Sequence, residues 1–88
     1  MTSTPTATLQ RRRLANEAMI AYVDWREACF AVTDAYAGWA AAEATDARLA
    51  FGAYTAALDR EERASQVYAD VIRRAGDGRR LISAADPT

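Results

Sequence analysis

Arginine is the residue type in this chain best suited to binding an anion, because its planar guanidinium offers five donors that match the oxygens of a phosphate or a carboxylate. All 11 basic residues are arginines. Seven of them form two groups, one near each end of the chain: Arg11, Arg12, Arg13, Arg73, Arg74, Arg79 and Arg80. In a chain that folds back on itself the two groups meet, and we predict an anion-binding pole there.

A second set of polar residues interrupts an otherwise apolar pattern. Glu61 and Ser65 stand where Leu or Val would be expected, and in a folded-back chain they face Arg26. An Arg26–Glu61 pair beside Ser65 would form a polar layer that fixes the register of two helices. The other interpretation is a pocket for an anionic substrate in a small helical enzyme. We favour the register layer.

Several classes of site need residues that this sequence lacks, since it contains no histidine and a single cysteine, Cys29. Ferritin-like metal sites use Glu-x-x-His units, zinc sites need several Cys or His ligands, and Ser-His or Cys-His nucleophiles need an imidazole. Cys29 is expected to be a small buried residue. We therefore predict no catalytic residue, no metal and no cofactor, and a protein that is not an enzyme.

The elements that position these residues are predicted to be helices. Apolar residues advance in alternating steps of three and four from Leu14 to Ala42 and again from Ala47 to Ala75, which is the pattern of a heptad helix. Both runs are too long for strands. Prolines lie only near the two ends, and helix-forming residues dominate between them. The pattern predicts an all-α protein.

Two further patterns indicate that the two helices form an antiparallel hairpin. Small residues recur every seventh position, where they let two backbones approach closely, and the series is Ala21, Ala28, Ala35 and Ala42, then Ala50, Ala57, Ala64 and Val71. Tyr36-Ala37-Gly38-Trp39 is also mirrored by Phe51-Gly52-Ala53-Tyr54 about Thr45. Both patterns place the turn near residue 46.

The predicted boundaries follow from the same signals. Thr45 is the expected N-cap of the second helix, and Gly76-Asp77-Gly78 is the expected stop at its end. The resulting parts are a disordered N-terminal tail 1–7, a hairpin 8–75 made of helix 8–43, a turn near 44–46 and helix 46–75, and a flexible C-terminal tail 76–88.

The apolar stripe of this hairpin is wider than one helix–helix contact requires. Burying a large apolar side chain stabilises a protein by about 1.5–3 kcal/mol, and large exposed apolar patches mark interaction sites. We expect a second copy to cover the stripe and to close a four-helix bundle by two-fold symmetry. The predicted oligomer interface consists of Tyr22, Trp25, Val32, Tyr36, Trp39, Phe51, Tyr54, Leu58, Tyr68 and Ile72.

These observations predict a non-enzymatic protein–protein association module that forms a homodimer, with another helical protein as an alternative partner. A nucleic-acid-associated protein that uses the arginine-rich pole is the main rival, and a small helical enzyme is the third hypothesis. The net charge of −1 gives no overall attraction to nucleic acid or to membranes. No run approaches the roughly 20 apolar residues of a membrane span, so we expect a cytoplasmic protein without a membrane partner. The lysine-free, alanine-rich composition suggests an actinobacterial or phage origin.

Overall fold

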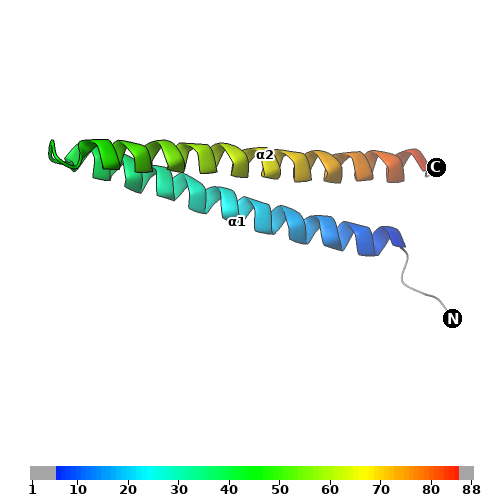
Figure 1. Cartoon of the computed structure of the whole chain (residues 1–88). Helices are drawn as coiled ribbons and strands as arrows, with labels where there is room; N and C mark the ends of the chain where they lie inside the picture. Colours follow the sequence, from blue (N-terminus) through cyan, green and yellow to red (C-terminus); the bar gives the residue numbers. More distant parts are fainter. Residues whose placement is uncertain (1–5, 86–88) are drawn as a thin grey trace.

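The computed structural model describes the backbone of residues 6–85 and the side chains of residues 6 and 8–77. Two α-helices make up this part of the chain: α1 is Thr6–Ala41 and α2 is Ala47–Ala85. They lie side by side near the turn and separate gradually toward the ends of the chain (Figure 1). This arrangement confirms the predicted all-α class and the antiparallel hairpin.

The hairpin is an elongated rod. Its radius of gyration is 19.9 Å, whereas a compact domain of this length would have a radius of gyration of about 12 Å. Its principal extents are 69, 25 and 13 Å, so most of each helix faces solvent. In the part of the chain that the structure describes, neither helix has a segment apolar enough to cross a membrane.

A short connection at 42–46 reverses the chain. Within it the Asp46 N–H donates to the Glu43 carbonyl at 2.9 Å. The Asp46 carbonyl then accepts the first hydrogen bond of α2 from the Ala50 N–H, also at 2.9 Å. Asp46 is therefore the N-cap of α2, one residue after the predicted cap Thr45, and its carboxylate suits the positive end of the helix dipole.

The contact between the helices follows the alanine series. The buried hydrophobic side chains among the described residues are Ala21, Ala28 and Val71, with exposed fractions of 4%, 0% and 3%. On α2 the less exposed positions include the heptad series Ala47, Ala50, Tyr54, Ala57, Glu61, Ala64, Tyr68, Val71 and Ala75. The predicted α2 positions Phe51, Leu58 and Ile72 are exposed beside this contact, because the helices approach most closely where α2 turns its small residues inward.

Helix α2 continues through the predicted stop and ends at Ala85, and α1 begins at Thr6. The predicted helix end at Ala75 is wrong because no described glycine has the positive φ of a left-handed C-cap. A helical glycine costs only about 1 kcal/mol relative to alanine, which does not terminate a helix flanked by good helix formers. The rest of the predicted tails, 1–5 and 86–88, lies outside the described residues.

Replacing Gly76 by alanine tests this helical continuation. We expect Gly76→Ala to raise the free energy of unfolding by about 0.5–1 kcal/mol, because alanine loses less backbone entropy in a helix. A Cβ atom at Gly76 would meet no atom within 4 Å, and the same holds at Gly52, so Gly52→Ala is a matched control. Thermal unfolding followed by circular dichroism measures both changes. A loss of stability in Gly76→Ala alone would indicate a left-handed cap.

Candidate interaction surface

Two aromatic clusters bridge the helices. The first consists of Tyr22 and Trp25 of α1 with Tyr68 of α2. The second consists of Tyr36 and Trp39 of α1 with Phe51 and Tyr54 of α2. Offset-stacked and edge-to-face pairs of this kind each contribute about 0.5–1.5 kcal/mol beyond burial. The clusters therefore hold the hairpin together at two depths.

The second cluster confirms the pairing of the mirrored segments. The ring centroids of Tyr36 and Tyr54 are 5.6 Å apart, and those of Trp39 and Phe51 are 5.0 Å apart. Both are pairs that the mirror places at equal distance from the turn. The sequence is mirrored because residues of one kind meet across the hairpin.

Much of the predicted oligomer interface remains exposed after this packing. Six of its side chains have exposed fractions between 36% and 53%: Tyr22, Tyr36, Trp39, Phe51, Leu58 and Ile72. Heptad spacing places them along one flank of the helix contact, which we call the aromatic side. The other four predicted residues, Trp25, Val32, Tyr54 and Tyr68, are half-buried between the helices.

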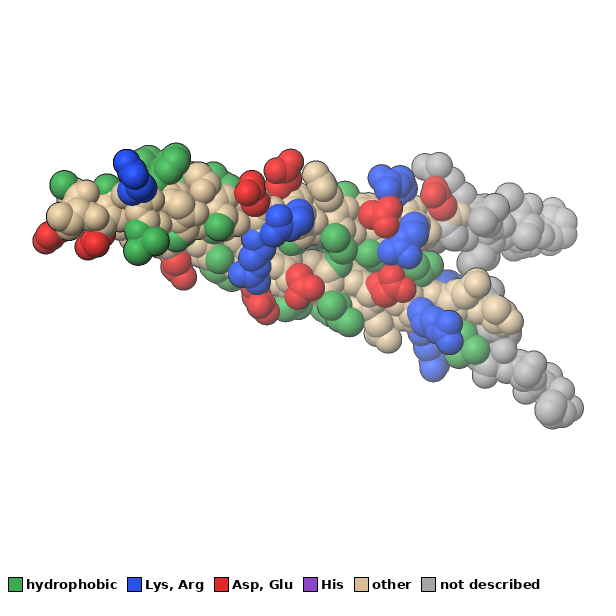
Figure 2. All heavy atoms as spheres, viewed as in Figure 1, with side chains coloured by type: hydrophobic (Ala, Val, Ile, Leu, Met, Phe, Trp, Pro, Cys, Tyr) green, Lys and Arg blue, Asp and Glu red, His purple; other side chains and the backbone are tan. Residues whose placement is uncertain are grey.

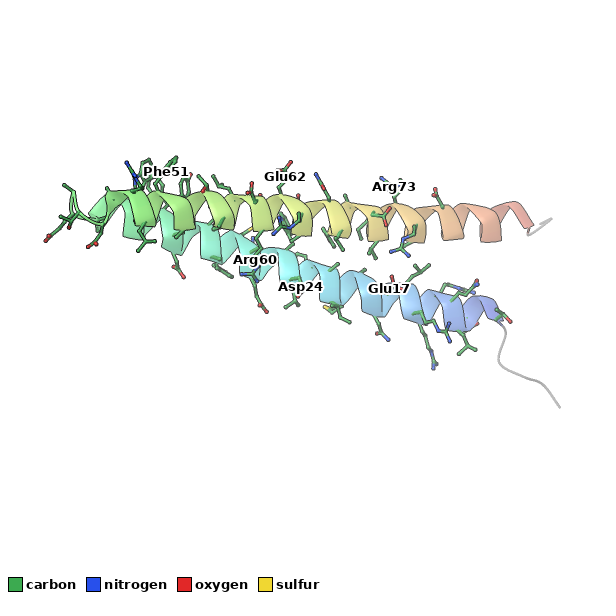
Figure 3. All side chains as sticks on the ribbon, viewed as in Figure 1. Glu17, Asp24, Phe51, Arg60, Glu62 and Arg73 are labelled. Carbon is green, nitrogen blue, oxygen red and sulfur yellow. The ribbon has the colours of Figure 1, made fainter. Side chains whose placement is uncertain are left out.

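The opposite flank carries charged residues of both signs, and we call it the charged side. Its charged residues include Glu17, Asp24, Arg60, Arg63, Asp70 and Arg74. Asp24, Arg60 and Arg63 line an open hollow of about 540 Å³ whose floor includes Ala21 and Ala64. Acidic and basic side chains lie next to one another along the line where the helices meet (Figure 2), and Asp24 and Arg60 reach this line from different helices (Figure 3). The hairpin is thus amphipathic across its width.

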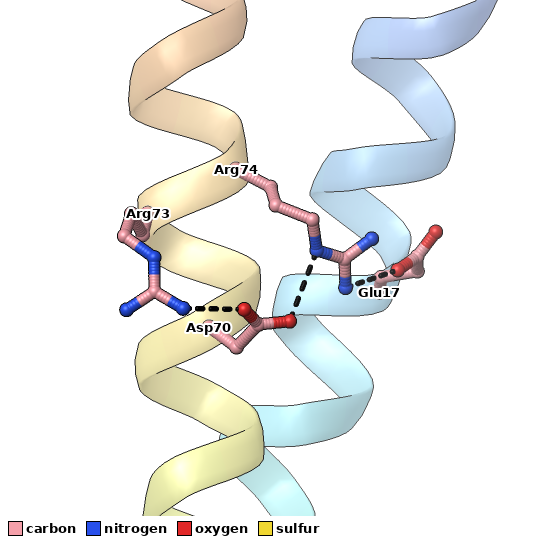
Figure 4. A network of polar contacts seen from close by, with 4 residues as sticks. All are labelled: Glu17, Asp70, Arg73 and Arg74. Carbon is pink, nitrogen blue, oxygen red and sulfur yellow. Dashed lines mark hydrogen bonds and ion pairs between the residues drawn. The ribbon is translucent and has the colours of Figure 1, made fainter.

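Two arginines of the predicted arginine-rich pole, Arg73 and Arg74, are paired with carboxylates of the same chain (Figure 4). Arg74 donates to Glu17 across the helices and to Asp70 within α2, both at 3.2 Å, and Arg73 also donates to Asp70. The arginines of α1 are exposed, and the helices diverge at this end (Figure 1). The side chains of Arg79 and Arg80 lie outside the described ones. The described arginines therefore do not converge on one anion site.

The predicted polar layer of Arg26, Glu61 and Ser65 is replaced by three separate contacts. Glu61 accepts a hydrogen bond from the Trp25 indole N–H at 2.9 Å. Ser65 donates to the Glu62 carbonyl at 2.8 Å, and the Arg26 guanidinium lies over the Phe30 ring at 5.3 Å from its centroid. In the described part of the chain Arg26 and Glu61 form no ion pair. The prediction erred because Arg26 lies on the outer face of α1, whereas Trp25 faces α2.

No family model, curated protein or solved structure matches this chain. Its function is therefore inferred from its surface.

An outer apolar patch on α1 was missed by the sequence interpretation. It consists of Met19, Ile20, Val23 and Phe30, with exposed fractions of 64%, 62%, 44% and 60%. These residues are spaced by three, four or seven positions, which places them on one face of a helix. This face could be recognised in the sequence as a second, weaker apolar stripe. The guanidinium of Arg26 lies over the ring of Phe30 at one end of this patch, and the patch as a whole stays exposed.

Cys29 lies between the aromatic clusters and is half-buried, less completely than predicted. Among the described residues no group of three or more His, Cys, Asp or Glu side chains is placed to hold a metal ion.

The hydrogen bond between Trp25 and Glu61 can be measured by a double-mutant cycle. We expect Glu61→Ala to lower the free energy of unfolding by about 1–2 kcal/mol, because the half-buried indole N–H loses a charged acceptor. In a Trp25→Phe background the same change costs at least about 0.5 kcal/mol less. Glu62→Ala is the control, since Glu62 is exposed on the outer face of α2 (Figure 3). Additive effects of Trp25→Phe and Glu61→Ala would contradict the coupling.

Proposed function

We propose that the protein is a non-enzymatic association module that forms a homodimer through its aromatic side. The observation that carries this proposal is the set of six large apolar side chains left exposed along one flank, opposite a flank of charged residues. An apolar strip of this kind is costly to leave in water, and monomeric proteins rarely expose one that is continuous. A second hairpin is the right length to cover it.

The exposed area is sufficient for a specific interface. A large side chain of this kind presents roughly 150–250 Å² when fully exposed, so the aromatic side exposes about 500 Å² per copy. Two copies together bury about 1,000 Å² of these side chains, which is the lower limit for a specific protein–protein contact. Backbone and small side chains between them add to this area.

Chromatography with light scattering tests the proposal. We expect a mass of twice the 9.6 kDa chain at micromolar concentration. The dimer should persist from low salt to about 1 M salt, because apolar burial is not screened by ions. A mass equal to one chain under these conditions would defeat the homodimer.

Measurements over the same range of salt concentrations also distinguish the association module from the nucleic-acid hypothesis. Binding through arginines releases counterions, so an affinity for nucleic acid would fall steeply with salt and would depend on Arg12 rather than on the aromatic side. Arg73 and Arg74 already have carboxylate partners, which lowers the charge available for phosphates. We therefore expect no nucleic-acid binding of comparable strength at physiological salt.

A further inference from the structure

We propose that the two hairpins of the dimer lie antiparallel, related by a two-fold axis at the layer of Cys29 and Glu61. The turn of each copy then lies near the arginine-rich end of the other. This arrangement rests on the proposed homodimer, and it specifies which residues of the second copy each part of the aromatic side contacts.

The first argument is an internal repeat in the aromatic packing. Trp25 stacks on Tyr68 at a centroid distance of 5.6 Å and an interplanar angle of 10°, and Trp39 stacks on Tyr54 at 5.5 Å and 15°. The pairs Tyr22–Tyr68 and Tyr36–Tyr54 also agree, at 5.7 Å and 58° against 5.6 Å and 65°. The hairpin thus presents nearly the same cluster twice.

The two clusters are separated by two heptads on each helix. The midpoint of Tyr22 and Tyr36 is Cys29, and the midpoint of Tyr54 and Tyr68 is Glu61. A two-fold axis through this layer carries Tyr22 to the depth of Tyr36 in the second copy and Tyr54 to the depth of Tyr68, so the tyrosines of each cluster lie level with the tyrosines of the other.

The same axis also sets which other side chains of the two copies lie near each other. On α1 it places Tyr22 over Tyr36 of the second copy. On α2 it carries Phe51 to within one residue of the depth of Ile72, and Leu58 to within one residue of the depth of the small Ser65. The small side chain of Cys29 lies on the axis, where two identical residues must share the space.

The charge distribution favours the antiparallel arrangement over the parallel one. Near the turn the acidic residues Asp34, Glu43 and Asp46 outnumber Arg48. At the open end the described side chains include five arginines, at positions 11–13 and 73–74, against the three acidic residues Glu17, Asp70 and Asp77, which leaves a charge of +2. Parallel hairpins would place two such ends together, and like charges in proximity oppose association.

The turn of the second copy lies where this charge distribution favours it. A rotation about the layer of Cys29 and Glu61 carries Glu43 to the depth of Ala15 and Asp46 to the depth of Gly76. These positions adjoin the arginines at 11–13 and 73–74. The acidic turn of one copy therefore lies beside the arginines of the other under the same two-fold axis that pairs the tyrosines.

Distances between spin labels on the two copies test the orientation. Single labels are placed at Asn16→Cys or Asp34→Cys in a Cys29→Ser background, since both sites are exposed and lie away from the aromatic side. At 1.5 Å per residue, the antiparallel axis separates the two Asn16 sites by about 39 Å along the rod and the two Asp34 sites by about 15 Å. We expect a clearly longer distance from position 16 than from position 34.

Each outcome separates the orientation from the dimer itself. Similar distances at both positions, in a sample with the mass of a dimer, would overturn the antiparallel arrangement and leave the proposed function intact. A single-chain mass for the unlabelled protein would overturn both. Cys29→Ser without a label, measured by light scattering, is the control for the background substitution.

Discussion

Ala28→Leu is expected to lower the melting temperature by roughly 5–15 °C. Ala28 has no exposed surface, and it lies in the alanine series along which the helices meet. Three extra carbon atoms there have no space to enter, so the helices must separate or adopt strained rotamers, at a cost of about 1–3 kcal/mol. A change of 1 kcal/mol shifts the melting temperature of a domain of this size by roughly 4–8 °C.

The control for this prediction is Ala37→Leu. Ala37 is exposed on α1, and leucine and alanine have similar helix propensities, so the same substitution should change stability by at most about 0.5 kcal/mol. Both variants are compared at one protein concentration, because dimerisation makes the melting temperature depend on concentration. Equal melting temperatures for the two variants would contradict close packing at Ala28.

Periodicity was sufficient to predict the helices and their pairing. The alternating steps of three and four define which face of α1 is buried, and the mirror about Thr45 pairs Tyr36 with Tyr54 as the structure does. These features repeat over many residues, so a local irregularity does not obscure them.

The rotation of α2 about its own axis was harder to predict. Two seams on α2 were compatible with the spacing, one containing Leu58 and the other Ala57. Hydrophobicity favours the seam with Leu58 at the helix contact. The structure instead places the seam with Ala57 there, because two helices lined with alanine can pack more closely, and this close packing depends on both helices together. The bulky residues of α2 therefore lie on the flank of the contact and not at its centre, which is why they remain available to a second copy.

Single side-chain partners were the least predictable features. Glu61 was assigned to Arg26 on the basis of charge, yet it pairs with the indole of Trp25, whose position depends on stacking against Tyr68. Likewise, Gly76 was interpreted as a stop because glycine is common there. A one-residue signal of this kind is weak against the continuity of a long helix, since it changes the free energy by only about 1 kcal/mol.

Leu58→Glu is expected to weaken the dimer by about 100-fold or more. Leu58 is 39% exposed in the single hairpin, so the substitution leaves the fold of α2 largely intact, which circular dichroism checks. In the dimer each glutamate would be buried without a partner, and a loss of 1.4 kcal/mol per copy already reduces the affinity 100-fold. Leu49→Glu is the matched control, because Leu49 is 79% exposed on the other flank of α2. Sedimentation equilibrium measures both dissociation constants.

A compensating charge then tests which residue Leu58 meets. In the antiparallel dimer Leu58 of each copy lies within one residue, about 1.5 Å, of the depth of Ser65 of the other, so Ser65→Arg added to Leu58→Glu creates two ion pairs between the copies and restores much of the affinity. Within one chain the two positions are about 10 Å apart along α2, too far for a direct pair. If Leu58→Glu alone dimerises like Leu49→Glu, the aromatic side is not the interface. If the double variant stays monomeric, Ser65 is not the residue that Leu58 meets.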